Sequence, residues 1–168
     1  DRVGLFLPNV PIYAAAYYGA MMAGAVVVNF SPLYTTSELA WQVGDSGTRV
    51  LVTLDVPELY GTAREVLESS DLETLVVGSL ADMLPRLKAI AFRLLKRSQI
   101  ASVEWSDAIR RWKDCTPDRP VETVEIDPRE DLALLQYTGG TTGRPKGAML
   151  GHDQLSVNAQ QVAAINPF

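Results

Sequence analysis

The sequence predicts an α/β fold, with a largely parallel sheet and helices on both of its faces. Strand-like and helix-like segments alternate along the chain, which is the order that parallel β-α-β units require. The strand-like runs are almost entirely apolar, as expected for strands that are covered on both sides. With 168 residues, 47% of them hydrophobic, the chain is long enough and apolar enough to bury a core.

The first β-α-β unit is expected at residues 3–7, 11–23 and 26–30. These segments overlap an uncharged, mostly apolar run, 10–28, which is as long as a membrane span. Prolines and glycines interrupt the region, and three consecutive valines near its end favour a strand. We therefore interpret it as two buried strands around an alanine-rich buried helix rather than as a membrane helix.

The alternation continues through the middle of the chain. Thr35 and Glu38 have the spacing of a capping box, which predicts the start of a helix, and Gly44 and Gly47 indicate its end. Asp55 is expected to cap the following helix. The elements expected here are a helix at 35–42, a strand at 50–54, a helix at 57–69 and a strand at 75–77.

The segment from Met83 to Arg97 is basic and contains no acidic residue, although the chain as a whole is acidic. Its leucines recur at helical spacing, which predicts an amphipathic helix. Such a helix can lie on an anionic membrane surface. The alternative is a surface helix whose apolar side packs on the sheet and whose basic side is solvated.

Residues 102–113 are expected to form another helix, with Trp105, Ile109 and Trp112 packed in the core on one face. Prolines and acidic residues are frequent in the next segment, which we interpret as a linker. The expected organisation is thus an α/β sheet part at 1–113, a linker at 114–131, and a strand-loop-strand with a following helix at 132–168.

The segment from Tyr137 to Gly147 reads YTGGTTGRPKG and follows an apolar run, 132–135, that predicts a buried strand. Glycines let backbone N–H groups converge on an anion. Threonine hydroxyls add hydrogen bonds, and Lys146 adds a compact positive charge. This composition is typical of a loop that holds a polyphosphate. A returning strand at 148–150 and a helix at 152–164 are expected after it.

The loop does not fit the Walker A pattern, because Gly147 follows Lys146 where that pattern has serine or threonine. It is therefore not an ordinary nucleotide-hydrolase P-loop. The alternative without a ligand is a glycine-rich hairpin with an exposed lysine.

Composition excludes several other classes of function. A net charge of −5 argues against a general nucleic-acid binder. Cys115 is the only cysteine, so no intramolecular disulfide is possible, which favours a reducing cytosol. His152 is the only histidine, and no triad or metal-ligand pattern surrounds it, so a capping or packing role is expected. Asp153 could equally cap the last helix.

The ordered string from Tyr137 to Gly147 resembles, at every position, the phosphate-binding signature of the adenylate-forming superfamily of AMP-binding enzymes and acyl-CoA synthetases. Residues 2–9 and 23–35 resemble two further blocks of these enzymes. Gly139 in the third motif position is most similar to bacterial long-chain-fatty-acid–CoA ligases, whereas Gly151 departs from their usual threonine. The resemblance implies a fragment of the large N-terminal domain of such an enzyme.

The resemblance implies ATP-dependent activation of a long-chain fatty acid to an acyl-adenylate and then to acyl-CoA, by an AMP-forming acid–thiol ligase. ATP, magnesium and coenzyme A would take part. Lys146 would stabilise charge on the leaving pyrophosphate, and Thr138 would contact magnesium. The residues implied to bind the nucleotide are Tyr137, Thr138, Gly139, Gly140, Thr141, Thr142, Gly143, Lys146 and Gly147; none is a nucleophile or a base.

Several groups of that superfamily would lie downstream of Phe168, in a remainder of the same chain, so the fragment alone is expected to be inactive. Two alternatives stay open: an adenylating enzyme for an aryl, short-chain or amino acid, and a noncatalytic nucleotide-binding module. The expected location is the cytoplasm, with contact at the inner membrane face through Met83 to Arg97 as an open option.

Overall fold

The computed structural model describes residues 1–115, 122, 124–139 and 145–166. These residues form one seven-stranded sheet with the strand order β5-β4-β3-β1-β2-β6-β7. Neighbouring strands are parallel except for β6 and β7, which are antiparallel. The strands are β1 (Arg2–Phe6), β2 (Val26–Phe30), β3 (Val50–Leu54), β4 (Thr74–Gly78), β5 (Ile109–Arg111), β6 (Leu132–Thr138) and β7 (Lys146–Gly151).

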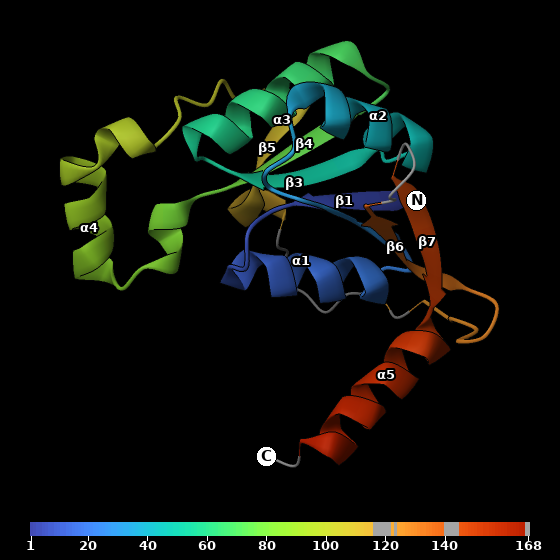
Figure 1. Cartoon of the computed structure of the whole chain (residues 1–168). Helices are drawn as coiled ribbons and strands as arrows, with labels where there is room; N and C mark the ends of the chain where they lie inside the picture. The colour runs from blue at the N-terminus through green and yellow to red at the C-terminus, as the bar shows by residue number, and fades with distance from the viewer. Residues whose placement is uncertain (116–121, 123, 140–144, 167–168) are drawn as a thin grey trace.

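Helices cover both faces of the sheet, which confirms the predicted fold class. Figure 1 shows α1 on one face and α2 with α3 on the other, whereas α4 stands to one side and α5 projects away. The α-helices are α1 (Pro11–Met22), α2 (Thr36–Ser46), α3 (Pro57–Ser69), α4 (Arg86–Leu95) and α5 (His152–Ile165). Short 3-10 turns are η1 (Leu80–Met83), η2 (Arg97–Gln99) and η3 (Trp112–Cys115).

The core lies in the central strands, where Leu5, Val27, Leu51 and Leu75 have no exposed surface. Gly4 in β1 is required by close packing, because a Cβ at this position would lie 2.5 Å from the ring of Phe30. The central strands are therefore apolar on both sides, as parallel strands between two helical layers must be.

Both signals that bound the helix predicted at 35–42 are confirmed, although the helix runs further than predicted, to Ser46. The Thr35 hydroxyl accepts the Glu38 N–H, and the Glu38 carboxylate accepts the Thr35 N–H at 2.8 Å, which completes the capping box. The helix continues through Gly44 and ends at Gly47, whose φ of 63° is the left-handed conformation that glycine adopts readily.

Two local expectations are wrong. Helix α1 is not buried all round: Ile12 and Ala16 face the core, whereas Tyr18 and Met22 are exposed, because only the sheet side of this helix is covered. Asp55 does not cap α3. Instead its buried carboxylate accepts the Leu80 N–H at 2.9 Å and ties the turn after β4 to the end of β3.

The helix predicted at 102–113 is also wrong. Residues 101–106 have no regular secondary structure, and β5 pairs with β4 at the edge of the sheet, with Ile109 opposite Leu75. Trp105 is half-exposed, and the Arg111 guanidinium lies 4.7 Å from its ring centroid. Strand pairing and this cation–π contact outweigh the helical spacing of the tryptophans.

Helix α4 forms within the predicted segment, Met83 to Arg97, but is shorter than predicted, and its apolar side does not pack on the sheet. Leu87, Leu94 and Leu95 are each at least 75% exposed, and Ala89 is the buried residue of the helix. The alternative of a surface helix is therefore wrong in one respect, because it predicted that the apolar side of the helix packs on the sheet. Within the described residues, no helix is both long enough and apolar enough to cross a membrane.

The linker assigned to 114–131 is described only in part. Segments on both sides of it contribute strands to the same sheet, since β6 pairs with β2. The division of the chain at this linker stays a prediction.

Candidate functional site

The glycine-rich segment joins β6 to β7 at the carboxyl edge of the parallel strands. Thr138 at the end of β6 pairs with Lys146 at the start of β7, so that the two stems of the loop lie side by side. In α/β sheets, ligands bind outside the carboxyl ends of the strands. The strand-loop-strand predicted from the sequence is therefore present at an edge that suits a ligand.

Three of the predicted binding residues are exposed at this edge. The Thr138 hydroxyl donates to the Lys146 carbonyl at 3.4 Å, and the Lys146 side chain is exposed. A Cβ added at Gly139 would meet nothing within 4 Å, so space is open beside the backbone. The remaining predicted loop residues, Gly140, Thr141, Thr142 and Gly143, lie outside the described residues.

Tyr137 and Gly147 lie directly below the loop and form the next pair of the ladder. The Tyr137 phenol is buried and donates to a carboxylate oxygen of Asp45 on α2 at 2.6 Å. Burial, together with the hydrogen bond to Asp45 and the charge of Asp45, raises the pKa of Tyr137. The side chain of Tyr137 therefore supports the loop from beneath.

A second set of hydrogen bonds reaches Tyr137 from the α1 face of the sheet. The Tyr13 phenol donates to Asn29 at 3.0 Å, and the Asn29 amide donates to Gln136 at 3.0 Å. The Gln136 amide in turn approaches the Tyr137 carbonyl at 3.4 Å. The residue that precedes the loop is thus held through its side chain on one face and its carbonyl on the other.

Sequence reasoning missed these supporting residues. Asn29 and Gln136 could have been found, because each is a polar residue inside an apolar strand, where it needs a partner. No sequence pattern distinguishes Asp45, because an acidic residue in a helix is usually a solvent-exposed one.

The predicted contact between Thr138 and magnesium requires an ion that takes few ligands from the protein. No group of three or more histidine, cysteine, aspartate or glutamate side chains close enough to hold a metal occurs among the described residues. Mg²⁺ bound with a nucleotide keeps waters and phosphate oxygens and takes only one or two protein ligands. The Thr138 hydroxyl could serve as one such ligand.

His152 lies away from this site. It begins α5 directly after Gly151, which pairs with Leu132 at the opposite end of β6 from the loop. The Gly151 N–H donates to the Gln154 side-chain oxygen at 2.8 Å, and Asp153 forms an exposed ion pair with Arg129.

Among the described residues, the two strand ends beside the loop, 137–139 and 145–147, can bind and polarise an anion but carry no nucleophile or general base.

A cavity of about 270 Å³ lies elsewhere, at the carboxyl ends of β3 and β4. Asp55, Trp105 and Arg111 are among its lining residues, whereas no described residue of the glycine-rich segment lines it. It is therefore separate from the candidate phosphate site.

The chain is similar in sequence to a known family of enzymes and to several of its members. The sequence model of the family described as "AMP-binding enzyme" matches residues 1–167. A long-chain-fatty-acid–CoA ligase of Bacillus subtilis is 37% identical over 168 residues, which cover 98% of this chain and 30% of that protein. The corresponding ligase of Salmonella typhimurium is 36% identical, with the same shares covered. The chain thus spans about 30% of the length of these curated relatives.

One of the proteins similar to this chain is named for an acid other than a long-chain fatty acid. A 4-coumarate–CoA ligase of Solanum tuberosum is 29% identical and is matched over 99% of this chain and 26% of its own length. Among solved structures, a long-chain-fatty-acid–CoA ligase from Archaeoglobus fulgidus superposes with a TM-score of 0.67 at 30% identity, covering 97% of this chain and 27% of that structure.

Proposed function

The chain belongs to the family of AMP-binding enzymes, and on that premise we propose that it is the ATP phosphate-binding part of an AMP-forming acid–thiol ligase. The observation that carries this proposal is the motif from Tyr137 to Gly147, with Thr138 and Lys146 paired at the carboxyl edge of a parallel sheet. In this proposal, the complete enzyme continues beyond this chain and supplies the remaining groups of the active site.

The proposed reaction has two steps. A carboxylate oxygen of the acid attacks the α-phosphorus of ATP, the bond to the bridging oxygen breaks, and pyrophosphate leaves with the bonding electrons. The sulfur of coenzyme A, whose thiol proton is released to water, then attacks the acyl carbon, and AMP leaves with the anhydride oxygen. The acid needs this activation because a carboxylate oxygen is a poor leaving group, whereas AMP is a stable one.

The loop acts on the first step, in which a highly charged pyrophosphate separates. Glycine backbone N–H groups and threonine hydroxyls would hold the β- and γ-phosphates, and Lys146 would offset the charge that develops there. Magnesium that travels with ATP would supply further positive charge, with Thr138 as its protein ligand. A distribution of donors around the leaving group stabilises the transition state without any covalent step by the protein.

The proposed acid substrate is a long-chain fatty acid. Support comes from relatives of that name at 34–37% identity. The 4-coumarate–CoA ligase relative at 29% identity favours a second candidate, activation of an aryl acid on the same loop. Both candidates share the adenylation chemistry and differ in the acid pocket.

Pyrophosphate release tests this function. A full-length protein that contains this chain is incubated with ATP, magnesium and carboxylic acids of increasing chain length, or with aryl acids. We expect release that depends on a long-chain acid, and none from the 168-residue chain alone. Release from the chain alone would contradict the incomplete-site proposal. A full-length protein that binds ATP but releases no pyrophosphate with any acid would be a noncatalytic nucleotide-binding module.

We further propose that α4 contacts membranes peripherally. Leu87, Ile90 and Leu94 recur at helical spacing, and all three are at least 55% exposed. The segment from Met83 to Arg97 carries five basic residues and no acid. An apolar stripe beside positive charge suits the surface of an anionic bilayer, where the enzyme would meet a fatty acid. We expect the protein otherwise to reside in the cytoplasm.

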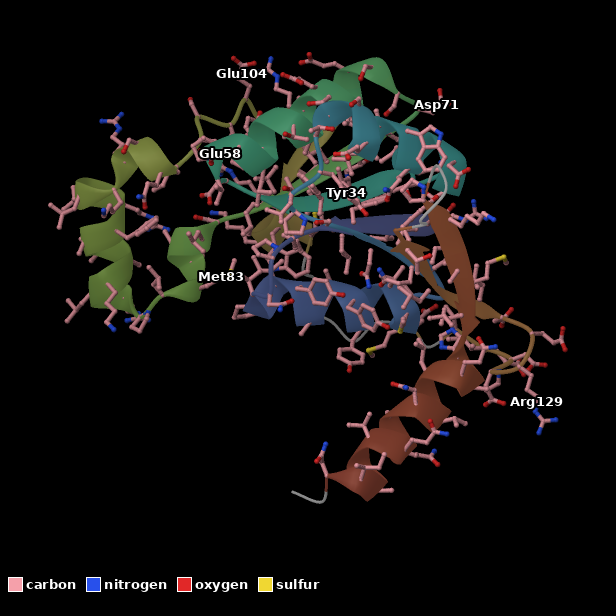
Figure 2. All side chains as sticks on the ribbon, viewed as in Figure 1. Tyr34, Glu58, Asp71, Met83, Glu104 and Arg129 are labelled. Carbon is pink, nitrogen blue, oxygen red and sulfur yellow. The ribbon has the colours of Figure 1, made fainter. Side chains whose placement is uncertain are left out.

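Co-sedimentation with vesicles tests this contact. Changing Arg86, Lys96 and Arg97 to Glu keeps the Arg93–Asp82 ion pair, and it should abolish pelleting with anionic vesicles. Arg129→Glu is a control for a charge reversal away from α4, because Figure 2 shows Arg129 on the opposite side of the molecule from Met83. Equal pelleting of the wild type and the triple variant would contradict the proposal, as would equal binding to zwitterionic vesicles.

A further inference from the structure

Tyr137 is the last buried side chain before the glycine-rich loop, and α2 holds it in place. Its phenol donates to the Asp45 carboxylate at 2.6 Å and lies 3.4 Å from the Gln42 carbonyl. Its ring stacks on Phe30 and meets Trp41 edge-on, with ring centroids 6.3 and 6.1 Å apart. A buried hydroxyl that loses its partner is costly, and of these two acceptors the Asp45 carboxylate makes the shorter hydrogen bond.

The element that supplies Asp45 is well defined at both ends. Helix α2 begins in a complete capping box at Thr35 and Glu38 and ends at Gly47 in the left-handed conformation. Asp45 lies in its last turn, one residue before Ser46, whose carbonyl accepts a hydrogen bond from Arg2 on β1. The carboxylate is therefore presented from a helix that is itself tied to the sheet.

The Tyr137 ring lies beside both stems of the loop. Tyr137 ends the buried part of β6 and pairs with Gly147 on β7, and a Cβ added at Gly147 would lie 3.4 Å from the ring, which is ordinary van der Waals contact. The next pair of the ladder is Thr138 with Lys146. A displaced ring would thus move the strand ends that carry the hydroxyl and the ammonium group.

We propose that Asp45 is a positioning residue for phosphate binding, which acts by holding the Tyr137 phenol so that Thr138 and Lys146 keep their register. This inference rests on the proposed function of the loop. Asp45 itself does not touch ATP. Its carboxylate orients the tyrosine, and the tyrosine supports the two strand ends between which the loop is closed.

Steady-state kinetics of the full-length enzyme test the inference. Asp45→Ala and Tyr137→Phe should each raise the KM for ATP by about tenfold, the size expected when a hydrogen bond to a charged group is lost. The KM for the carboxylic acid should stay at its wild-type value. Asp45→Asn retains an acceptor oxygen and should restore most of the affinity. Asp71→Ala removes an exposed carboxylate beyond the end of α3 (Figure 2) and serves as the matched control.

The double variant, Asp45→Ala with Tyr137→Phe, separates positioning from general destabilisation. If both residues act through one bond, its KM for ATP should equal that of either single variant. Additive effects would overturn the inference. So would a lower Tm of Asp45→Ala with an unchanged KM for ATP, or equal increases in the KM for ATP and for the acid.

Failure of the proposed function gives a different result. A wild-type protein that releases no pyrophosphate contradicts the ligase assignment, and calorimetric affinity for ATP then replaces KM in the same comparison of variants. A wild-type protein that does not bind ATP overturns both the function and the role of Asp45.

Discussion

At the scale of single residues, Lys146 is the charged side chain among the described residues next to the loop, 137–139 and 145–147. It is exposed at the start of β7, opposite Thr138. One unit charge at about 4 Å contributes roughly 4 kcal/mol at an effective dielectric constant near 20, which sets an upper scale for its effect on the leaving pyrophosphate. Its contribution should be largest where charge develops.

We therefore expect Lys146→Met to lower kcat for pyrophosphate release by about 10²–10³-fold, the usual cost of removing one donor to a developing charge. A pyrophosphate-coupled assay of the full-length enzyme, with saturating acid, measures this. Lys88→Met on α4 is the control and should retain wild-type activity in the absence of membranes. A loss below about tenfold for Lys146→Met would contradict the assigned role.

At the scale of elements, α2 links the stability of the fold to the loop, because it carries both a capping box and Asp45. Hydrogen bonds from the Thr35 backbone and hydroxyl lower the pKa of Glu38 below its ordinary value of 4.5. A carboxylate with a lowered pKa contributes stability above its unfolded pKa. That contribution is lost as the pH falls through the folded-state value.

Thr35→Ala should accordingly reduce the free energy of unfolding by about 1 kcal/mol at pH 7, the typical cost of removing a threonine cap. The difference from the wild type should shrink near pH 3, because the partner Glu38 is then increasingly protonated. Urea unfolding at both pH values measures this. Thr62→Ala in the interior of α3 is the control and should not destabilise, since alanine favours helix. A difference that grows as the pH falls would contradict the capping argument.

At the scale of the whole molecule, the strand order separates the two proposed surfaces. The loop lies on the β2-β6-β7 side of the central strand β1, whereas α4 follows β4 on the other side. Figure 1 shows α4 and β7 at opposite sides of the sheet. Charge changes on α4 should therefore leave the phosphate site unaltered, which is why the vesicle and pyrophosphate experiments are independent.

Elements with strong local signals were predicted almost to the residue. The structure has β2 at Val26–Phe30, β3 at Val50–Leu54 and α3 at Pro57–Ser69, which are the predicted bounds. Valine runs, prolines at helix starts and the capping box act within a few residues, so the sequence alone carries them. The region 102–113 was mispredicted because its backbone pairs with β4, a contact that no local pattern contains.

The order of residues from Tyr137 to Gly147 by itself determined the family signature and the candidate phosphate loop, because the backbone freedom of glycine, the threonine hydroxyls and the lysine charge are properties of the residue types themselves. The tertiary structure alone decided that Asp45 meets Tyr137, that Asn29 meets Gln136, and that the apolar side of α4 faces solvent. The two contacts join residues that are far apart in the chain, and the exposure of α4 reflects the lack of a packing partner for its apolar side among the described residues. They follow from strand order and layer geometry, which local sequence patterns do not encode.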